Sequence, residues 1–172
     1  MPAHRILTTA LDTPIGPLSL AARGDTLIAA GFGAAPAALL PRLHVSLRSA
    51  PTGAARPADL PWLVTPVQAY FDGDLTALDG LPVYQPASPG RQRMWEQLRA
   101  VPPGTTVTYT ELAARAGQPT APRAAGAACA ANLIAPVVPC HRALRTDGSL
   151  GGYYYGLDRK RWLLRHEGVS MR

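Results

Sequence analysis

The sequence is poor in cysteine, and this shortage argues against two classes of protein. Only Cys129 and Cys140 occur among 172 residues, which is too few for the disulfide framework of a small secreted domain. Neither has a second Cys or a His at the spacing of a zinc site. We therefore expect two reduced thiols, no metal and no cofactor.

Long hydrophobic runs are also missing. No stretch of 18 apolar residues occurs, whereas a helix that crosses a bilayer needs about 20. Residues 1–5 lack the charged and then apolar layout of a secretion signal. Since 47% of the residues are apolar, the chain can bury a globular core. We expect a cytoplasmic protein with no membrane contact.

Net positive charge is absent from the first half of the chain and concentrated in the second. Residues 1–89 contain five Arg and six Asp, a net charge of −1, whereas residues 90–172 contain twelve basic and five acidic residues, a net charge of +7. Such a concentration suits a polyanion such as nucleic acid. The alternative is a solvated basic surface without a partner.

Short β-prone segments separated by turn residues dominate the start of the chain. Residues 6–11, 18–22 and 26–32 are such segments, and Pro, Gly and Asp occur between them. This pattern predicts a small antiparallel sheet. Residues 50–61 are rich in Pro, Ala and Gly, and we expect a loop without regular structure there.

One packing helix is predicted after that loop. The apolar residues that recur at helical spacing are Leu63, Val67, Tyr70 and Phe71. Asp72 and Gly73 end the pattern. A second Pro- and Gly-rich cluster at residues 85–90 coincides with the change in charge. We therefore predict an N-terminal domain of residues 1–86 and a C-terminal domain of residues 87–172.

The second half is predicted to be mainly helical. Met94, Trp95 and Leu98 form one apolar helix face. A β-prone stretch at residues 105–109 precedes Thr110, which we expect to cap a short helix.

A second helix is predicted directly after this one. The first should cover residues 111–116 and end at Gly117, and Thr120 can cap the second, which runs to about Ala131. Two short helices joined by a tight turn match the helix-turn-helix pattern, which has both DNA-binding and purely structural uses.

The second helix of this pair is composed almost entirely of small residues. Ala and Gly predominate at residues 124–131, and such a surface could approach a minor groove, which is only about 6 Å wide. Arg123 at its start could fill the gap left by an extruded base. The alternative is a helix packed closely in the core, and composition alone favours that alternative.

Cys140 and His141 are the candidate reactive pair. They follow an apolar, strand-like run that begins at Asn132. A free thiol has a pKa of about 8.5, so a nucleophilic Cys needs a base nearby. Adjacent residues on a strand point in opposite directions, so His141 would act through a bridging water or from a turn. Glu167 is the candidate carboxylate that orients the imidazole. A buried thiol beside a capping His is the alternative.

A longer set of motifs surrounds this pair. The segments are Asn132, Pro139-Cys140-His141-Arg142, residues 148–153 and residues 159–168. Together they resemble the active-site region of the O6-alkylguanine-DNA alkyltransferases, closely so over about residues 91–168. Residues 13–18 look like the opening hairpin of the bacterial members.

The resemblance implies a fold and an activity. The fold is of the α+β class, with a small N-terminal antiparallel-sheet domain that is ribonuclease H-like and a mainly helical C-terminal domain with a helix-turn-helix. The activity is DNA repair by a single-turnover methyltransferase. A monomer binds the minor groove of double-stranded DNA, flips O6-alkylguanine out of the duplex and transfers the alkyl group irreversibly to Cys140.

The resemblance also implies roles for individual residues. Cys140 is the alkyl acceptor, and His141 is the water-mediated base. Glu167 orients His141, and Asn132 braces the turn that carries the thiol. Tyr109 helps to rotate the nucleotide and donates a hydrogen bond to guanine N3. Arg123 replaces the flipped base. The remaining DNA-binding residues are Thr110, Ala124, Gly126 and Ala127. The substrate-pocket residues are Pro139, Ala143, Tyr153, Tyr154 and Tyr155.

The chain departs from the family pattern at three places. Leu133 follows Asn132 where Pro is common, and Ala143 stands where Val is common. The usual run of Tyr, a small residue and two Gly appears as residues 153–156, Tyr-Tyr-Tyr-Gly. The added rings could narrow the pocket or stack on DNA. Our hypothesis is that benzyl adducts react poorly compared with methyl adducts.

Three other functions compete with this interpretation. A damage sensor of the alkyltransferase-like group would lack the acceptor Cys and usually the N-terminal domain. A transcriptional regulator resembling the adaptive-response proteins would need an additional Cys-rich zinc domain. A Cys-His hydrolase would need an oxyanion hole. The sequence carries Cys140 and specifies neither a zinc domain nor an oxyanion hole.

Overall fold

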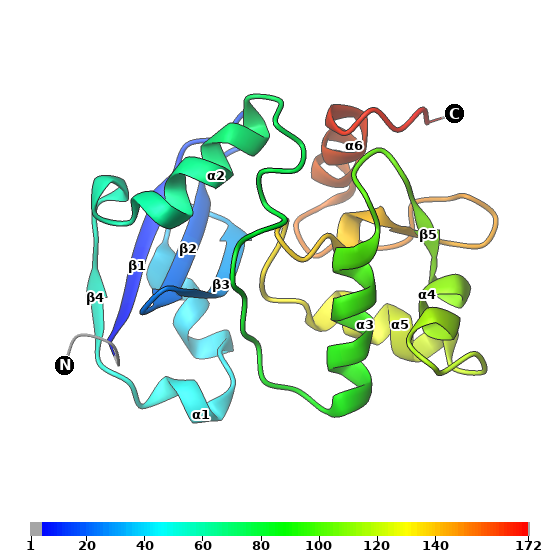
Figure 1. The fold of residues 1–172 in the computed structure, drawn as a ribbon, viewed down its shortest axis with the longest axis horizontal. Coiled ribbons are helices and arrows are strands. Elements are labelled where there is room, and N and C mark those ends of the chain that lie inside the picture. The colour runs from blue at the N-terminus through cyan, green and yellow to red at the C-terminus, as the bar shows by residue number, and fades with distance from the viewer. Residues whose placement is uncertain (1–4, 172) are drawn as a thin grey trace. The chain divides into compact units, whose positions relative to one another are not determined.

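The computed structural model describes residues 5–171, which form two compact units (Figure 1). One unit contains the described residues up to Pro86 together with Leu133–Val137. The other contains Ala87–Asn132 and the described residues from Val138 onward. Of the helices in residues 5–171, none is both long enough and apolar enough to span a membrane.

Leu133–Val137 is the part of the chain that our predicted domain boundaries misplaced. We assigned it to the C-terminal domain, but it pairs with β3 (Thr26–Phe32) of the first unit. Ala30 donates its N–H to Leu133 O at 2.8 Å and accepts the N–H of Ala135 at 3.1 Å. These bonds pair the backbone N–H and C=O of Ala30 at the edge of β3. The partners are far apart in the sequence, so local patterns do not predict this pairing.

The first unit contains a four-stranded sheet. β1 (Ile6–Leu11), β2 (Leu18–Arg23) and β3 pair antiparallel, as the turn spacing predicted. β4 (Thr52–Ala54) adds to the other side of β1 in parallel, so the strand order is β3-β2-β1-β4.

The prediction that residues 50–61 lack regular structure was wrong. They contain β4 and a short 3-10 helix, η3 (Pro57–Asp59). The Arg5 guanidinium donates to Thr52 O at 3.0 and 3.2 Å, and the Ala55 N–H donates to Thr8 O at 2.8 Å. The edge of β1 therefore imposes the extended conformation on a segment with low β propensity.

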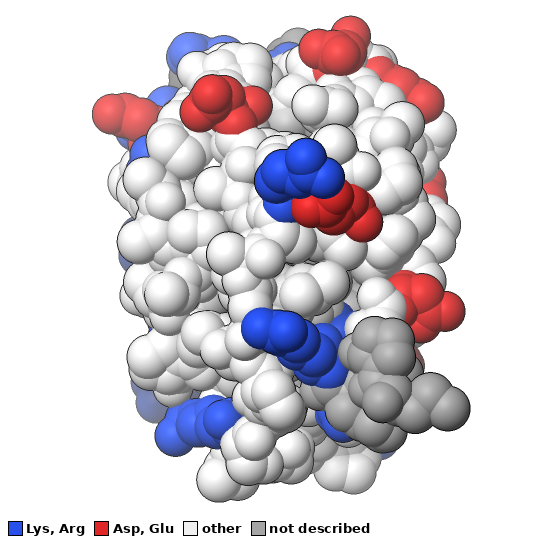
Figure 2. Space-filling model, turned by 90° about the vertical axis from the view of Figure 1, so that its left-hand side faces the viewer, with Lys and Arg blue, Asp and Glu red and all other residues white. Residues whose placement is uncertain are grey.

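The sheet and three helical segments enclose the core of the first unit. The helical segments are η2 (Pro36–Arg42), α1 (Val45–Arg48) and α2 (Pro61–Phe71). α2 buries Leu63, Val67 and Tyr70, as predicted, and Figure 1 shows it beside the strands. The surface over this unit carries scattered charges of both signs among mostly uncharged atoms (Figure 2). This agrees with the small net charge of the first half.

The second unit is mainly helical. Its helices are α3 (Pro89–Ala100), α4 (Tyr109–Arg115), α5 (Pro122–Ala131), the 3-10 helix η4 (Cys140–Arg142) and α6 (Leu157–His166). β5 (Val107–Thr108) and β6 (Ala143–Leu144) form a two-stranded parallel sheet.

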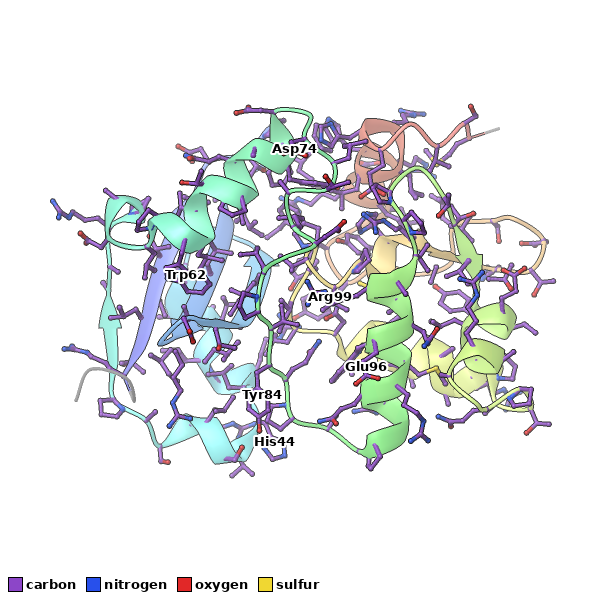
Figure 3. The ribbon with its side chains drawn as sticks, viewed as in Figure 1. His44, Trp62, Asp74, Tyr84, Glu96 and Arg99 are labelled. Atoms are coloured by element: carbon purple, nitrogen blue, oxygen red, sulfur yellow. The ribbon has the colours of Figure 1, made fainter. Side chains whose placement is uncertain are left out.

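α3 holds the predicted helix pair in place. It buries Met94, Trp95 and Leu98, as predicted, and it packs against both α4 and α5. The indole N–H of Trp95 donates to Ala128 O at 2.9 Å. The opposite side of α3 carries the exposed Glu96 and the partly exposed Arg99 (Figure 3).

Both predicted caps of the helix pair were wrong by one or two residues. Thr108, and not Thr110, caps α4: its Oγ1 accepts the N–H of Glu111 at 3.1 Å, and the Glu111 carboxylate accepts the N–H of Thr108 at 2.8 Å. Only Thr108 has a Glu three residues later, which the capping box requires.

The second cap fails for a different reason. α5 begins at Pro122, and Ala121 precedes it without a side-chain cap, so Thr120 caps nothing. Proline presets its own φ at the first helical position and disfavours a helical residue before it. Gly117 between the helices has φ of +77°, as its position after α4 predicted.

Candidate active site

Cys140 and His141 lie on a turn. The predicted strand-like run ends before them, and Cys140–Arg142 form η4. The Cys140 N–H donates to Val138 O at 2.9 Å, and the Arg142 N–H donates to Pro139 O at 3.0 Å. All three η4 side chains are buried. Of the two geometries that we considered for His141, the structure has the turn.

Asn132 fixes the position of the Cys140 thiol. Its Nδ2 donates to Val138 O at 2.8 Å and to Cys140 Sγ at 3.3 Å. Burial raises the pKa of the Cys140 thiol, while the hydrogen bond from Asn132 and the charge of Lys160 act in the opposite direction. Asn132 therefore bonds to the turn at Val138 and favours the thiolate form of Cys140.

His141 and Glu167 form a fully buried pair. His141 Nε2 lies 2.8 Å from Glu167 Oε1, and both side chains have no exposed surface. A carboxylate only accepts hydrogen bonds, so Nε2 carries the proton and Nδ1 has the free lone pair. Burial lowers the pKa of His141, although the contact with Glu167 opposes this. The ring is therefore neutral, and Nδ1 can act as a base.

Nδ1 of His141 is also buried and has no hydrogen-bond partner among residues 5–171. Buried polar atoms are rarely left unpaired, and an unpaired one often marks a functional position.

Arg142 completes the network around Glu167. Its Nε and Nη2 donate to the two carboxylate oxygens, both at 2.9 Å, and its Nη1 donates to Val101 O at 2.5 Å. Burial alone would raise the pKa of Glu167, but the hydrogen bonds from His141 and Arg142 and the charge of Arg142 outweigh it and hold the pKa below its ordinary value. Glu167 is therefore ionised. Arg142 was not among the predicted site residues.

A cavity of about 330 Å³ opens onto the thiol. The residues that line it are Tyr109, Gly126, Cys129, Ala130, Cys140, Arg145, Gly151, Gly152, Tyr153 and Tyr154. Of the predicted pocket residues, Tyr153 and Tyr154 belong to this wall. Pro139 and Ala143 are buried elsewhere, and Tyr155 packs edge-on against Tyr153 and Tyr154 without lining the cavity.

Sequence reasoning missed half of the cavity wall. Cys129, Ala130, Arg145, Gly151 and Gly152 were not among the predicted site residues. A signal existed for α5, because Gly126, Cys129 and Ala130 have the i, i+3, i+4 spacing of one helix face. The remaining three residues come from loops, where spacing carries no such information.

Tyr109 projects from the start of α4 into this cavity. Burial raises the pKa of its phenol to about 12, so the hydroxyl stays protonated and can donate a hydrogen bond. Gly151 permits the approach of this ring: a Cβ there would lie 2.8 Å from the Tyr109 hydroxyl oxygen. Gly151 also has φ of +68°, which disfavours any other residue.

Lys160 joins the loop before α6 to the segment after Cys140. That loop contributes residues 151–154 to the cavity wall. It is fully buried, and its Nζ donates to Ala143 O at 2.8 Å, to Gly152 O at 3.2 Å and to Leu150 O. Burial lowers the pKa of Lys160 to about 8. Its burial could not be predicted, because lysine is almost always exposed.

α5 has a buried face and an accessible face. Ala125 and Ala128 are buried against neighbouring elements. Arg123 and Ala127 are exposed, and Ala124 and Gly126 are half-buried. Thr110 on α4 is also exposed. The predicted DNA-contacting residues thus lie on accessible parts of the helix pair.

Comparisons with known proteins identify relatives of this chain. Residues 89–169 match the family model described as 6-O-methylguanine DNA methyltransferase, DNA binding domain. A methylated-DNA–protein-cysteine methyltransferase of Salmonella typhimurium is 47% identical over 102 residues, which cover 59% of this chain and 60% of that relative. The relative of the same name from Mycobacterium bovis is 37% identical over 157 residues, which cover 91% of this chain and 89% of the relative.

Solved structures give the same result. The crystal structure of Mycobacterium tuberculosis OGT in complex with DNA aligns with a TM-score of 0.77 and 33% identity, covering 95% of this chain and 92% of that one. The α+β fold is therefore shown. With the match to the Mycobacterium bovis relative over 91% of this chain, these findings establish that the chain belongs to the methylated-DNA–protein-cysteine methyltransferase family.

Proposed function

We propose that this protein repairs DNA by transferring the alkyl group of O6-alkylguanine in duplex DNA irreversibly to Cys140. The observation that carries the proposal is a buried thiol at the wall of a cavity, held by Asn132 and adjacent to the His141–Glu167 pair. The family membership supplies the reaction type. We further propose that the protein acts in the cytoplasm as a monomer.

Binding must first bring the damaged base out of the duplex. O6 of guanine is inaccessible to Cys140 inside the base stack, and rotation of the nucleotide costs a few kcal/mol. We assign Arg123 to fill the vacated space, and Thr110, Ala124, Gly126 and Ala127 to the minor-groove contact. The small, accessible side chains of α5 suit a close approach of the helix to that narrow groove.

The transfer step uses the buried pair as a base. Nδ1 of His141 takes the proton of Cys140 through a bridging water, and Glu167 stabilises the imidazolium that forms. The thiolate attacks the alkyl carbon, a C–S bond forms, and the C–O6 bond breaks. The electron pair of that bond leaves with guanine, whose developing charge accepts a hydrogen bond from Tyr109.

The product explains why the reaction stops after one event. Alkylated Cys140 is a thioether, and the site has no group that would cleave a C–S bond. No cofactor enters the balance, because the protein itself is the alkyl acceptor. Each molecule therefore repairs one lesion.

Intact mass spectrometry tests this function. Incubation with duplex DNA carrying O6-methylguanine should add one methyl group to the protein and leave guanine in the DNA. Cys140→Ala is the control and should gain no mass while still binding the lesion. Tight binding of the wild-type protein without any mass gain would contradict the proposal and would identify a damage sensor instead.

A further inference from the structure

A second thiol shares the cavity with Cys140. Cys129 on α5 and Cys140 on η4 both line the same 330 Å³ space, and both are free thiols. The proposed repair reaction uses only one of them. Cys129 is therefore a soft, nucleophilic group in a cavity with no role assigned to it.

Asn132 bonds to both cysteines, to one through its backbone and to the other through its side chain. Its backbone N–H donates to Cys129 O at 3.2 Å, and its side chain donates to Cys140 Sγ at 3.3 Å. One residue, itself buried, thus connects the last turn of α5 to the turn that carries Cys140. Both cysteines line one cavity, and Asn132 connects the two elements that carry them.

The surroundings of the two thiols favour a neutral, thiophilic ligand. Burial raises the pKa of both Cys129 and Cys140, so both are protonated in the resting protein. No carboxylate of residues 5–171 lines the cavity, which disfavours hard cations such as Mg²⁺ or Ca²⁺. A structural zinc site usually needs four ligands, and the described residues contain no cluster of three or more His, Cys, Asp or Glu that could hold a metal.

We propose that Cys129 and Cys140 form a dithiol site for trivalent arsenic. Arsenous acid is small and uncharged, and As(III) is a soft centre suited to sulfur ligands. Two As–S bonds form and two As–O bonds break, and each thiol proton leaves with a hydroxide as water. The third hydroxide stays on arsenic, whose oxidation state does not change. The bound species is neutral, so the buried cavity imposes little desolvation cost.

Phenylarsine oxide is the probe for a first experiment. It has one exchangeable oxygen, so chelation by two thiols releases one water and adds one phenylarsenic group. Intact mass spectrometry under non-denaturing conditions should show one group per wild-type protein. Both free thiols should disappear from a colorimetric thiol count. An excess of a monothiol should not remove the group, whereas dithiothreitol should remove it.

Variants at the two cysteines test the chelation. Cys129→Ser and Cys140→Ser each leave one thiol, and we expect the apparent affinity for phenylarsine oxide to fall by at least about tenfold, with the adduct removed by monothiol. Cys129→Ala serves as the second variant if the serine disturbs α5.

A matched control moves the second thiol out of the cavity. In Cys129→Ser/Ala127→Cys the protein again has two thiols on the same elements, but position 127 is exposed and does not line the cavity. This variant should behave like Cys129→Ser.

Two results would overturn the proposal. One is an adduct on Cys129→Ser that resists monothiol as well as the wild-type adduct does. The other is a wild-type protein that keeps one free thiol after binding. Neither readout depends on alkyl transfer, so these experiments test the arsenic site independently of the repair function.

Discussion

Two regions of the second unit differ in how tightly their side chains are held. The inner network, which we define as Asn132, Cys140, His141, Arg142 and Glu167, is buried, and hydrogen bonds join its members. The outer surface, defined as Arg123, Ala127 and Tyr154, is exposed. The proposed chemistry therefore lies where geometry is fixed, and the proposed DNA contacts lie where side chains can adapt. Substitutions should affect stability in the first region and binding in the second.

The largest effect is expected at Glu167. Glu167→Ala removes the shared partner of His141 and Arg142 and leaves a buried guanidinium without its counter-ion. We expect a loss of about 3–5 kcal/mol in the free energy of unfolding, measured by urea denaturation. Asp158→Ala is the control, since its carboxylate pairs with Arg161 at the surface, and it should leave the unfolding midpoint unchanged. Equal effects of both substitutions on the unfolding midpoint would show that the buried network stabilises the fold no more than a surface ion pair does.

Lys160→Met should have the next largest effect. The substitution leaves the carbonyls of Ala143, Leu150 and Gly152 without their buried donor, and we expect a loss of about 1–3 kcal/mol in stability. The transfer rate should fall more than the affinity for lesion DNA, because the loop that carries Leu150 and Gly152 loses its anchor while Arg123 and Ala127 on α5 are unaffected. Lys160→Arg keeps the charge but cannot reproduce the three bonds, so it should not restore the rate.

Acid should weaken the inner network in two steps. Burial lowers the pKa of His141 from an ordinary 6.5, so below that pH the unfolded chain binds a proton that the folded protein does not. Stability should fall by up to about 1.4 kcal/mol per pH unit. The pKa of Glu167 is held below its ordinary 4.5, so a second loss begins below that value.

Urea midpoints between about pH 7.5 and 4 measure this dependence. His141→Asn should flatten the curve between the two ordinary pKa values. A wild-type midpoint that rises on acidification across this range would show that His141 is protonated in the folded protein.

Arg123→Ala tests the outer surface, where we expect the transfer rate to change and the stability to stay the same. Arg123 is exposed at the start of α5, so the free energy of unfolding should change by less than about 0.5 kcal/mol. The single-turnover transfer rate on duplex O6-methylguanine should fall by about tenfold or more, because the vacated base stack is left unfilled. The rate on free O6-benzylguanine, which needs no base flipping, is the control and should be nearly unchanged.

Tyr154→Ala should produce the smallest effect. Tyr154 lines the cavity yet is 65% exposed, and its ring packs against Tyr155 at a centroid distance of 4.9 Å. Removal should raise the benzyl-to-methyl rate ratio a few-fold by widening the cavity mouth, with stability nearly unchanged. A ratio that falls would mean that the ring binds bulky adducts by stacking. Tyr155→Ala, which lies behind this wall, should change the ratio less.

The sequence predicted the parts of the structure that depend on local pattern. The three antiparallel strands, α2 and α3 follow from hydrophobic spacing and turn residues, and the Cys140 region follows from its motif. β4 could not be predicted, because residues 52–54 have low strand propensity and become a strand by pairing with the edge of β1. The capping box at Thr108 and Glu111 is a local pattern that the sequence itself contains.

The site shows the same division. Cys140, His141, Glu167 and Asn132 were identified from the motif, and the structure brings them together. Their roles in transfer stay predictions. The burial of Lys160 depends on carbonyl groups of Ala143, Leu150 and Gly152, which lie outside its own helix. No local pattern encodes such contacts.

The identity of the acceptor atom is the central claim, and lesion excess tests it most directly. The protein should be incubated with a tenfold excess of duplex DNA whose O6-methylguanine carries a ¹³C methyl group, and then digested for peptide mapping. We predict one ¹³C-methyl thioether per molecule, on the peptide that contains Cys140, with Cys129 unmodified. A methyl group on Cys129, more than one per molecule, or none at all would contradict the account.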